Sequence, residues 1–239
     1  MEKRLKTLFS DKDIIVCIKP AGVISEDVPG GMPDLIRAEL AREQTAAADS
    51  GIAGAEVYPV HRLDKGVGGV MVYAFSKEAA ADLTRQITEK KFTKEYLAVV
   101  EGVPEPASGR MEDLLFHSAR ENRTYVVKRM RKGVKEAALE YEVLKTVSMA
   151  DETSRMLSLV RIRLLTGRTH QIRAQFSSRK LPLSGDRRYG AKTSGDIALW
   201  SHRLSFRHPE TGEPLTFEVS PPSPEFQDTI SSQFFHTFF

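Results

Sequence analysis

The chain is poor in cysteine. Its 239 residues include one cysteine, Cys17, which excludes an internal disulfide and any metal site built from spaced cysteines. Cys17 lies inside the apolar run at residues 14–18, so we expect it to be a small core residue in a reducing compartment.

Long hydrophobic runs are also missing. No apolar stretch approaches the roughly 20 residues that cross a bilayer, and residues 1–13 lack the apolar segment of a secretion signal. We therefore expect a cytoplasmic protein without a membrane contact. The content of 41% hydrophobic and 28% charged residues is that of an ordinary globular protein. A chain of 239 residues favours a single domain, residues 1–239.

A strong net charge is absent as well. The formal charge of +3 does not by itself indicate a nucleic-acid partner. The basic residues are unevenly distributed, however, because residues 120–135 hold seven cationic side chains and one acidic residue, Glu121. Such a stretch can follow the phosphates of a nucleic acid. A solvated loop or hairpin face is an equally good interpretation of the composition.

Hydrophobic periodicity predicts many strands and few helices. Helical spacing indicates helices at residues 33–47, at 77–89 with Ser76 as the N-cap, and at 170–178. Apolar or alternating runs predict strands at residues 14–18, 70–74, 94–100, 125–127, 138–144, 158–165, 197–200, 204–206 and 215–219. This pattern favours an α+β sheet protein.

Two polar runs stand about a hundred residues apart. The first reads HRLD and ends at Asp64, and the second reads TGRTHQIR at residues 166–173. The first places a carboxylate beside a cation and a histidine, and the second offers two arginines, a histidine and an amide after a glycine turn. An aspartate held by an arginine keeps its charge and a fixed direction. Two such runs meet only through the fold, which is how active sites are usually assembled.

These runs carry a family resemblance, because the chain resembles the RluA-type pseudouridine synthases. The signature run reads HRLDKGVGG at residues 61–69, and TGRTHQIR matches a second family block. Four further blocks follow the family order: IIVCIKPAGV (14–23), FTKEYLAVVEG (92–102), LPLSGDRRYG (181–190) and LSFRHPETGEPLTF (204–217). The resemblance covers residues 14–219 and implies the pseudouridine synthase fold: a long, bent, mostly antiparallel mixed sheet with flanking helices and a central active-site cleft.

The resemblance implies an isomerase with three catalytic residues. Asp64 matches the family's essential aspartate, which acts at the sugar C1′ while uracil detaches, turns and rejoins through C5. Arg168 matches its guanidinium partner, although a structural ion pair elsewhere is the alternative. Tyr96 matches the tyrosine that stacks on uracil and takes the C5 proton; the alternative is an ordinary half-buried strand tyrosine.

Other matched positions imply contacts with RNA. A base inside a stack must be extruded before it can react, and Arg62 matches the family arginine associated with the extruded nucleotide. His61 could serve there as well, but packing under the loop is the favoured interpretation. The remaining candidates are an apolar residue against the uracil, which is Leu165 or alternatively Leu164, and two groups near the RNA backbone, His170 and Arg173.

The resemblance has gaps that limit what it implies. Val67 and Gly68 replace the hydroxyl residues that usually follow the signature aspartate, which removes a possible hydrogen bond to Asp64. Only about a dozen residues precede residue 14, so we expect the catalytic domain without the small RNA-binding domain of some members. Residues 220–239 form an aromatic C-terminal tail, interpreted as a packed final element or as a partner contact.

The sequence therefore predicts an RNA pseudouridine synthase that modifies ribosomal or transfer RNA. We expect a monomer that needs no cofactor and no metal. The alternative is a non-catalytic RNA-binding or ribosome-assembly factor that keeps the fold. A metal hydrolase built from His61, Asp64 and His170 is a remote third interpretation, because these residues lack metal-ligand spacing.

Overall fold

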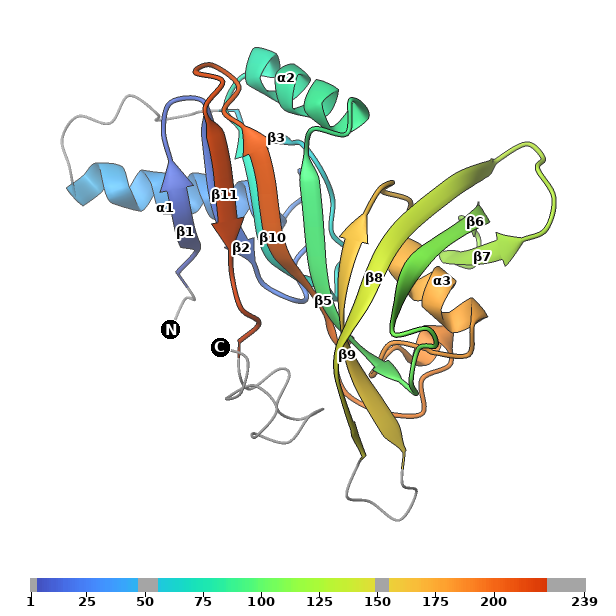
Figure 1. The fold of residues 1–239 in the computed structure, drawn as a ribbon. Helices are drawn as coiled ribbons and strands as arrows, with labels where there is room; N and C mark the ends of the chain where they lie inside the picture. The colour runs from blue at the N-terminus through green and yellow to red at the C-terminus, as the bar shows by residue number, and fades with distance from the viewer. Residues whose placement is uncertain (1–3, 47–55, 149–154, 223–239) are drawn as a thin grey trace. The chain divides into compact units, whose positions relative to one another are not determined.

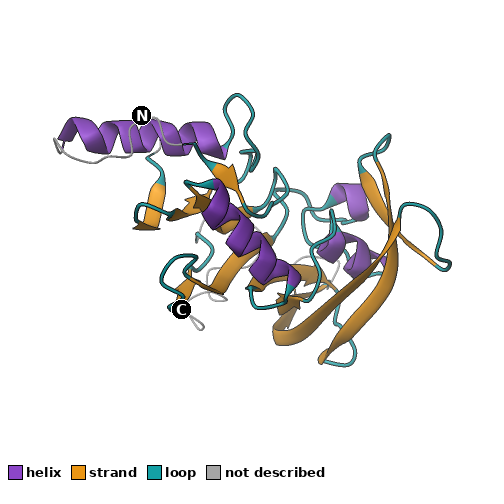
Figure 2. Ribbon diagram, turned by 90° about the horizontal axis from the view of Figure 1, so that it is seen from above, coloured by secondary structure: helices purple, strands orange, loops and turns teal. Residues whose placement is uncertain are grey.

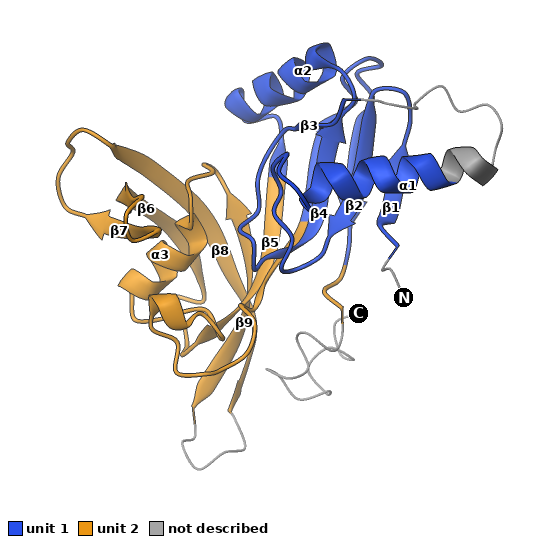
Figure 3. Cartoon of the chain, turned by 180° about the vertical axis from the view of Figure 1, so that it is seen from behind, with its two compact units in different colours: residues 1–93, 203–219 blue, residues 94–202, 220–239 orange. Residues whose placement is uncertain are grey.

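The structure is a computed structural model that describes residues 4–46, 56–148 and 155–222. The chain forms two compact units, shown in Figure 3: unit 1 comprises residues 1–93 and 203–219, and unit 2 comprises residues 94–202 and 220–239. The boundary falls inside two strands, β5 (Thr93–Glu101) and β10 (Leu199–Arg207). The sequence-based expectation of a single domain stays a prediction.

Unit 1 contains the helices α1 and α2 and the strands from both ends of the described sequence (Figure 1). The strands follow the order β1-β2-β4-β10-β11, and β3 also pairs with β4. The elements of this unit are β1 (Lys6–Ser10), β2 (Ile14–Lys19), α1 (Met32–Ala46), β3 (Tyr58–Pro59), β4 (Gly68–Ala74), α2 (Lys77–Thr88) and β11 (Pro214–Glu218).

The pairing of β2 with β4 positions the first signature run. Both strands are almost wholly buried, as their apolar sequences require, and they pair antiparallel from Ile14↔Ala74 to Lys19↔Gly69. Helix α1 crosses one face of the β1–β2–β4 sheet (Figures 1 and 3). The pairing therefore brings the end of β2, at Lys19, beside the start of β4, which follows the HRLD run directly.

Helix α2 begins where the sequence predicts. Ser76 is the N-cap, and its side chain accepts a hydrogen bond from the Ala79 N–H at 3.1 Å. Such a cap satisfies one of the four N–H groups that a helix start leaves without a partner. The buried face of α2, which includes Leu83, packs on the core of unit 1.

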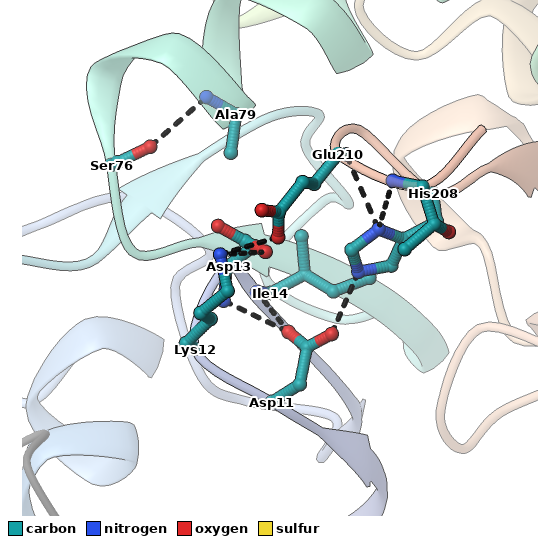
Figure 4. Close-up of polar contacts among 9 residues, drawn as sticks. Asp11, Lys12, Asp13, Ile14, Ser76, Ala79, His208 and Glu210 are labelled. Carbon is teal, nitrogen blue, oxygen red and sulfur yellow. Dashed lines mark hydrogen bonds and ion pairs between the residues drawn. The ribbon is translucent and has the colours of Figure 1, made fainter.

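A polar cluster joins the β1–β2 turn to the β10–β11 turn (Figure 4). His208 is buried and its Nε2 lies 2.7 Å from Asp11 Oδ2, while Asp11 Oδ1 accepts the N–H groups of Asp13 and Ile14. Lys12 forms ion pairs with Asp13 and Glu210 across the same turns.

The tautomer of His208 follows from its partners. Its Nδ1 accepts two backbone N–H groups, those of Glu210 and Thr211, so the proton of a neutral ring stands on Nε2 and is donated to Asp11. Among the described residues, Asp11, Asp13 and His208 place potential metal-ligand atoms within 4.8 Å of one another. A protonated Nε2 cannot bind a metal, so this cluster is better described as a hydrogen bond from His208 to Asp11 that joins the two turns, called the staple below.

Unit 2 consists mainly of antiparallel strands, the longest of which are drawn in orange at the right of Figure 2. Their order is β5-β9-β8-β6-β7. Helix α3 packs against β6 and β7. Besides β5, the elements are β6 (Ser108–Ser118), β7 (Arg123–Val127), β8 (Val134–Ser148), β9 (Met156–Leu164), α3 (Gln171–Ser178) and a 3-10 turn (Arg187–Tyr189).

The α+β prediction is confirmed, with local differences. Three strands, β1, β3 and β6, were not predicted, and the runs at 197–200 and 204–206 form one strand, β10. In the part of the chain that the structure describes, no helix is long and apolar enough to cross a membrane. The aromatic tail at 223–239 lies outside the described residues.

Candidate active site

Three of the predicted site residues lie on one loop of unit 1, between β3 and β4. Asp64 is half-buried, Arg62 is exposed and His61 is buried. His61 Nε2 lies 3.3 Å from the Val72 N–H, and its ring packs against Phe92 with the ring centroids 5.7 Å apart. This position favours the packing role over the RNA contact for His61.

The backbone on both sides of Asp64 is fixed by hydrogen bonds. Ser25, which is fully buried, donates its hydroxyl to Leu63 O at 2.9 Å and accepts the Leu63 N–H at 3.0 Å. On the other side, Lys65 O accepts the Gly22 N–H at 2.7 Å, and the Val67 N–H bonds Asp64 O at 2.9 Å. The backbone of the loop is therefore held by hydrogen bonds on both sides of Asp64. The hydroxyl that Val67 lacks is not needed for these bonds.

Lys19 is the second anchor of this loop. Its side chain is fully buried, and its ammonium donates three hydrogen bonds, to Pro20 O at 2.9 Å, Val23 O at 2.6 Å and Lys65 O at 3.3 Å. Burial lowers the pKa of Lys19 to about 8, against the opposing effects of the nearby Asp64 and Glu26 carboxylates. The Lys19 ammonium is thus close enough to Asp64 for the two charges to attract each other.

Sequence reasoning did not assign a role to Lys19 or Ser25. The Lys-Pro-Ala-Gly turn was recognised only as one block of the resemblance. The sequence does contain a sign of the role of Lys19, because a lysine at the end of an otherwise apolar strand is unusual and needs hydrogen-bond acceptors if it is buried.

Arg62 is held by an acidic partner on the neighbouring loop. Its Nη1 lies 2.9 Å from Glu26 Oε1, and both side chains are substantially exposed. An exposed ion pair of this kind is worth at most about 1 kcal/mol. The ion pair therefore holds Arg62 only weakly.

The other predicted residues lie in unit 2, where β5 begins and β9 ends. Tyr96 is buried in β5 and pairs with Ile162 of β9. Strand β9 ends at Leu164, and the half-buried Leu165 follows, with its N–H donated to Ala138 O at 3.1 Å. Leu165 thus stands directly before the TGR turn, and its expected contact with uracil stays a prediction.

The TGR turn is locked onto β8. Thr166 Oγ1 accepts the Ala138 N–H at 2.9 Å and donates to Gln171 Oε1 at 2.7 Å, and the Gln171 amide returns to Ala138 O at 3.0 Å. Arg168 donates its N–H to Gln171 Oε1 at 3.0 Å and its Nε–H to Glu136 O at 2.9 Å. Among the described residues, the two terminal nitrogens of Arg168 form no hydrogen bond or ion pair. Because the side chain is exposed, these two nitrogens can bind another group.

His170 and Arg173 lie at the start of α3, His170 half-buried and Arg173 buried. His170 precedes α3 with a φ of 53°, a left-handed conformation that is strained for a side chain, and its Nδ1 lies 3.1 Å from the Tyr189 hydroxyl. Arg173 is buried and forms two bonds to the Asp186 carboxylate, at 2.6 and 2.9 Å. This ion pair supports the turn at residues 184–190; the RNA contact expected of Arg173 stays a prediction.

Comparisons with known proteins define the class. The sequence model described as RNA pseudouridylate synthase matches residues 13–178. The chain therefore belongs to the RNA pseudouridylate synthase family, and it is an RNA pseudouridine synthase, an isomerase.

Curated relatives and solved structures agree with this assignment. The chain is 33% identical over 225 residues to the dual-specificity RNA pseudouridine synthase RluA of Salmonella typhimurium, covering 91% of this chain and 94% of the relative. It is 33% identical over 230 residues to an uncharacterized RNA pseudouridine synthase of Aquifex aeolicus, covering 91% and 70%.

Two human structures share the fold. RNA pseudouridylate synthase domain containing 4 matches with a TM-score of 0.71 at 22% identity, covering 91% of this chain and 88% of that chain. RNA pseudouridylate synthase domain containing 1 matches with a TM-score of 0.72 at 21% identity, covering 91% and 84%. The prediction of the pseudouridine synthase fold is confirmed.

Proposed function

We propose that this enzyme isomerises a specific uridine of ribosomal or transfer RNA, with Asp64 acting at the sugar C1′. The C1′–N1 bond breaks, uracil turns, and a C1′–C5 bond forms. The C5 proton leaves and N1 takes up a proton, so atoms and electrons balance within one nucleotide. The reaction then needs no cofactor and no metal.

The anchoring of the Asp64 loop carries this proposal. Leu63 and Lys65, the neighbours of Asp64, are fixed by Ser25, Gly22 and Lys19. A group that attacks or stabilises a reacting carbon gains most from such fixed geometry, because a misplacement of about 1 Å can cost about a hundredfold in rate. A protein that only binds RNA has no comparable need to fix the backbone on both sides of one aspartate.

Tyr96 and Arg168 are assigned the remaining chemical roles. We propose that Tyr96 stacks on the extruded uracil and takes the C5 proton, and that Arg168 holds the Asp64 carboxylate. The exposed terminal nitrogens of Arg168 support this role, since a guanidinium can hold both oxygens of a carboxylate. Arg62, Leu165 and His170 are proposed to contact the RNA.

The loop between β7 and β8, two strands that each pair with β6, is proposed to bind the RNA phosphates. Lys128, Arg129 and Lys132 are exposed there beside Met130, which is 56% exposed. Arg131 instead lies over the Phe116 ring, with 5.0 Å from its Cζ to the centroid, and Arg123 lies over the Tyr125 and Tyr189 rings. Only part of the basic stretch is thus free to follow RNA, and RNA binding should weaken as salt rises.

The proposal is tested with ribosomal and transfer RNA from cells that lack the gene. The purified protein should raise the pseudouridine content after digestion to nucleosides, and Asp64→Asn, which keeps the shape of the side chain, should not. Unchanged pseudouridine with the parent protein, together with tight RNA binding by both, would favour the non-catalytic RNA-binding factor. The expectation of a cytoplasmic monomer stays a prediction; light scattering of the purified protein measures its mass.

A further inference from the structure

A second buried lysine, Lys94, stands in unit 2. It is the second residue of β5 and is about nine-tenths buried. Burial lowers the pKa of Lys94, and no nearby carboxylate counters that effect. Among the described residues, no hydrogen bond or ion pair involves its ammonium.

The contrast with Lys19 is informative. Lys19 is also buried, but its three ammonium hydrogens all reach carbonyl oxygens. An ammonium that is desolvated without such partners destabilises a folded protein. Lys94 therefore weakens the fold, and a binding role would explain why it is present.

Lys94 lies beside the residues assigned to the reaction. Residues i and i+2 of a strand share a face, so Lys94 and Tyr96 lie on the same face of β5. Lys94 also reaches the TGR turn, because a β-carbon at Gly167 would lie 3.2 Å from Lys94 Nζ. Gly167 has no positive φ, so its lack of a side chain keeps space beside the ammonium rather than permitting a special backbone conformation.

We propose that Lys94 is a substrate-binding residue whose ammonium takes an oxygen of the target nucleotide, beside Tyr96 and Gly167. This proposal rests on the proposed function. An ammonium is a compact donor without directional preference, which suits a phosphate oxygen or a uracil carbonyl oxygen equally. The phosphate and the uracil both offer an electron-rich oxygen, which would accept the hydrogen bond that the Lys94 ammonium does not make within the protein.

The test compares three variants with the parent protein. Lys94→Met removes the charge and keeps the length of the chain, Lys94→Arg keeps the charge, and Lys192→Met removes a charge from an exposed lysine of the same unit. Each is measured for its melting temperature, for pseudouridine formation in ribosomal and transfer RNA from cells that lack the gene, and for binding of that RNA at increasing KCl.

Lys94→Met should retain or raise the melting temperature and should lose at least about tenfold in kcat/KM, since one hydrogen bond to a charged group is worth about 1.5–3 kcal/mol. Lys94→Arg should lose less, and Lys192→Met should stay close to the parent. A phosphate contact would also lower the slope of log Kd against log salt by about 0.7, whereas a uracil contact would leave that slope unchanged and reduce kcat.

Two results would overturn the proposal. Parent-like turnover, binding and salt slope in Lys94→Met would show that the ammonium touches no substrate. A lowered melting temperature with activity that falls only in proportion to the unfolded fraction would assign Lys94 to the fold. The parent protein tests the proposed function separately, because its failure to form pseudouridine would reject the proposed reaction. In that case, the comparison of RNA binding between the parent and Lys94→Met would still test whether Lys94 contacts the RNA.

Discussion

The buried charge of Lys19 predicts a particular dependence of stability on pH. Its pKa is about 8 in the folded protein, against 10.5 for a free lysine side chain. Below pH 8, Lys19 is charged in both the folded and the unfolded states, so the full cost of burying the charge is present. Between these pKa values the unfolded state binds more protons, and the contribution of Lys19 to stability therefore rises with pH.

The magnitude follows from the size of the shift. About 2.5 pKa units at roughly 1.4 kcal/mol each give about 3.5 kcal/mol over the whole range, of which about 2 kcal/mol falls between about pH 7.5 and about pH 9.5. The perturbation is Lys19→Met, which removes the titrating group. Lys94 and every other titrating group remain in both proteins and cancel in the difference.

Urea denaturation measures this difference. The free energy of unfolding of the parent minus that of Lys19→Met should increase by about 2 kcal/mol between these two pH values. A difference that stays constant with pH would mean that the Lys19 ammonium is not desolvated, and the proposed anchoring of Lys65 by a buried charge would be wrong. A difference that falls with pH would indicate a dominant attraction to Asp64 and Glu26.

Three further predictions concern the supports of the site and of unit 1. Gly31→Ala should displace the loop that carries Ser25 and Glu26, because its β-carbon would clash with Glu26 O, and melting temperature and uridine conversion should both fall. Gly212→Ala meets no neighbouring atom but is strained by a φ of 70°, so it should lower the melting temperature and leave conversion by the folded protein intact. Asp186→Asn leaves the buried Arg173 guanidinium without its counter-charge and should destabilise the protein by about 3–5 kcal/mol in urea titrations; a loss below about 1 kcal/mol would contradict the buried ion pair. Asp11→Asn turns an amide donor or a weaker acceptor toward His208 Nε2 and should cost about 1–2 kcal/mol of unfolding free energy, and an unchanged midpoint would show that the staple contributes nothing.

Much of the fold could be predicted from local patterns. The strands β2, β4 and β5 are buried on both faces and therefore read as apolar runs, and α2 carries both its cap and its apolar face in the sequence. Strand β6 was missed because its burial alternates irregularly and polar residues interrupt it. Strand β10 was divided in two because the polar segment Ser201–Arg203 is largely buried within it, which pattern reasoning does not anticipate.

The candidate site was predictable only in part. The runs that contain Asp64 and Arg168 stand out because of their composition, and the structure places each on a loop held by hydrogen bonds between side chains and the backbone. The groups that lock them were not predictable, since Ser25 and Lys19 act on residues 38 and 46 positions further along the chain. Lys94 resembled an ordinary strand residue until its burial and lack of partners were known.

The most direct test of the central claim is a map of pseudouridine positions in total ribosomal and transfer RNA, by carbodiimide labelling and primer extension. Cells with the gene, cells without it, and cells that carry an Asp64→Ala copy are compared. The account predicts at least one position that is marked only in cells with the intact gene and that the Asp64→Ala copy does not restore. A map that is the same in all three, or a mark that the Asp64→Ala copy restores fully, would contradict the assignment of Asp64 as the catalytic group.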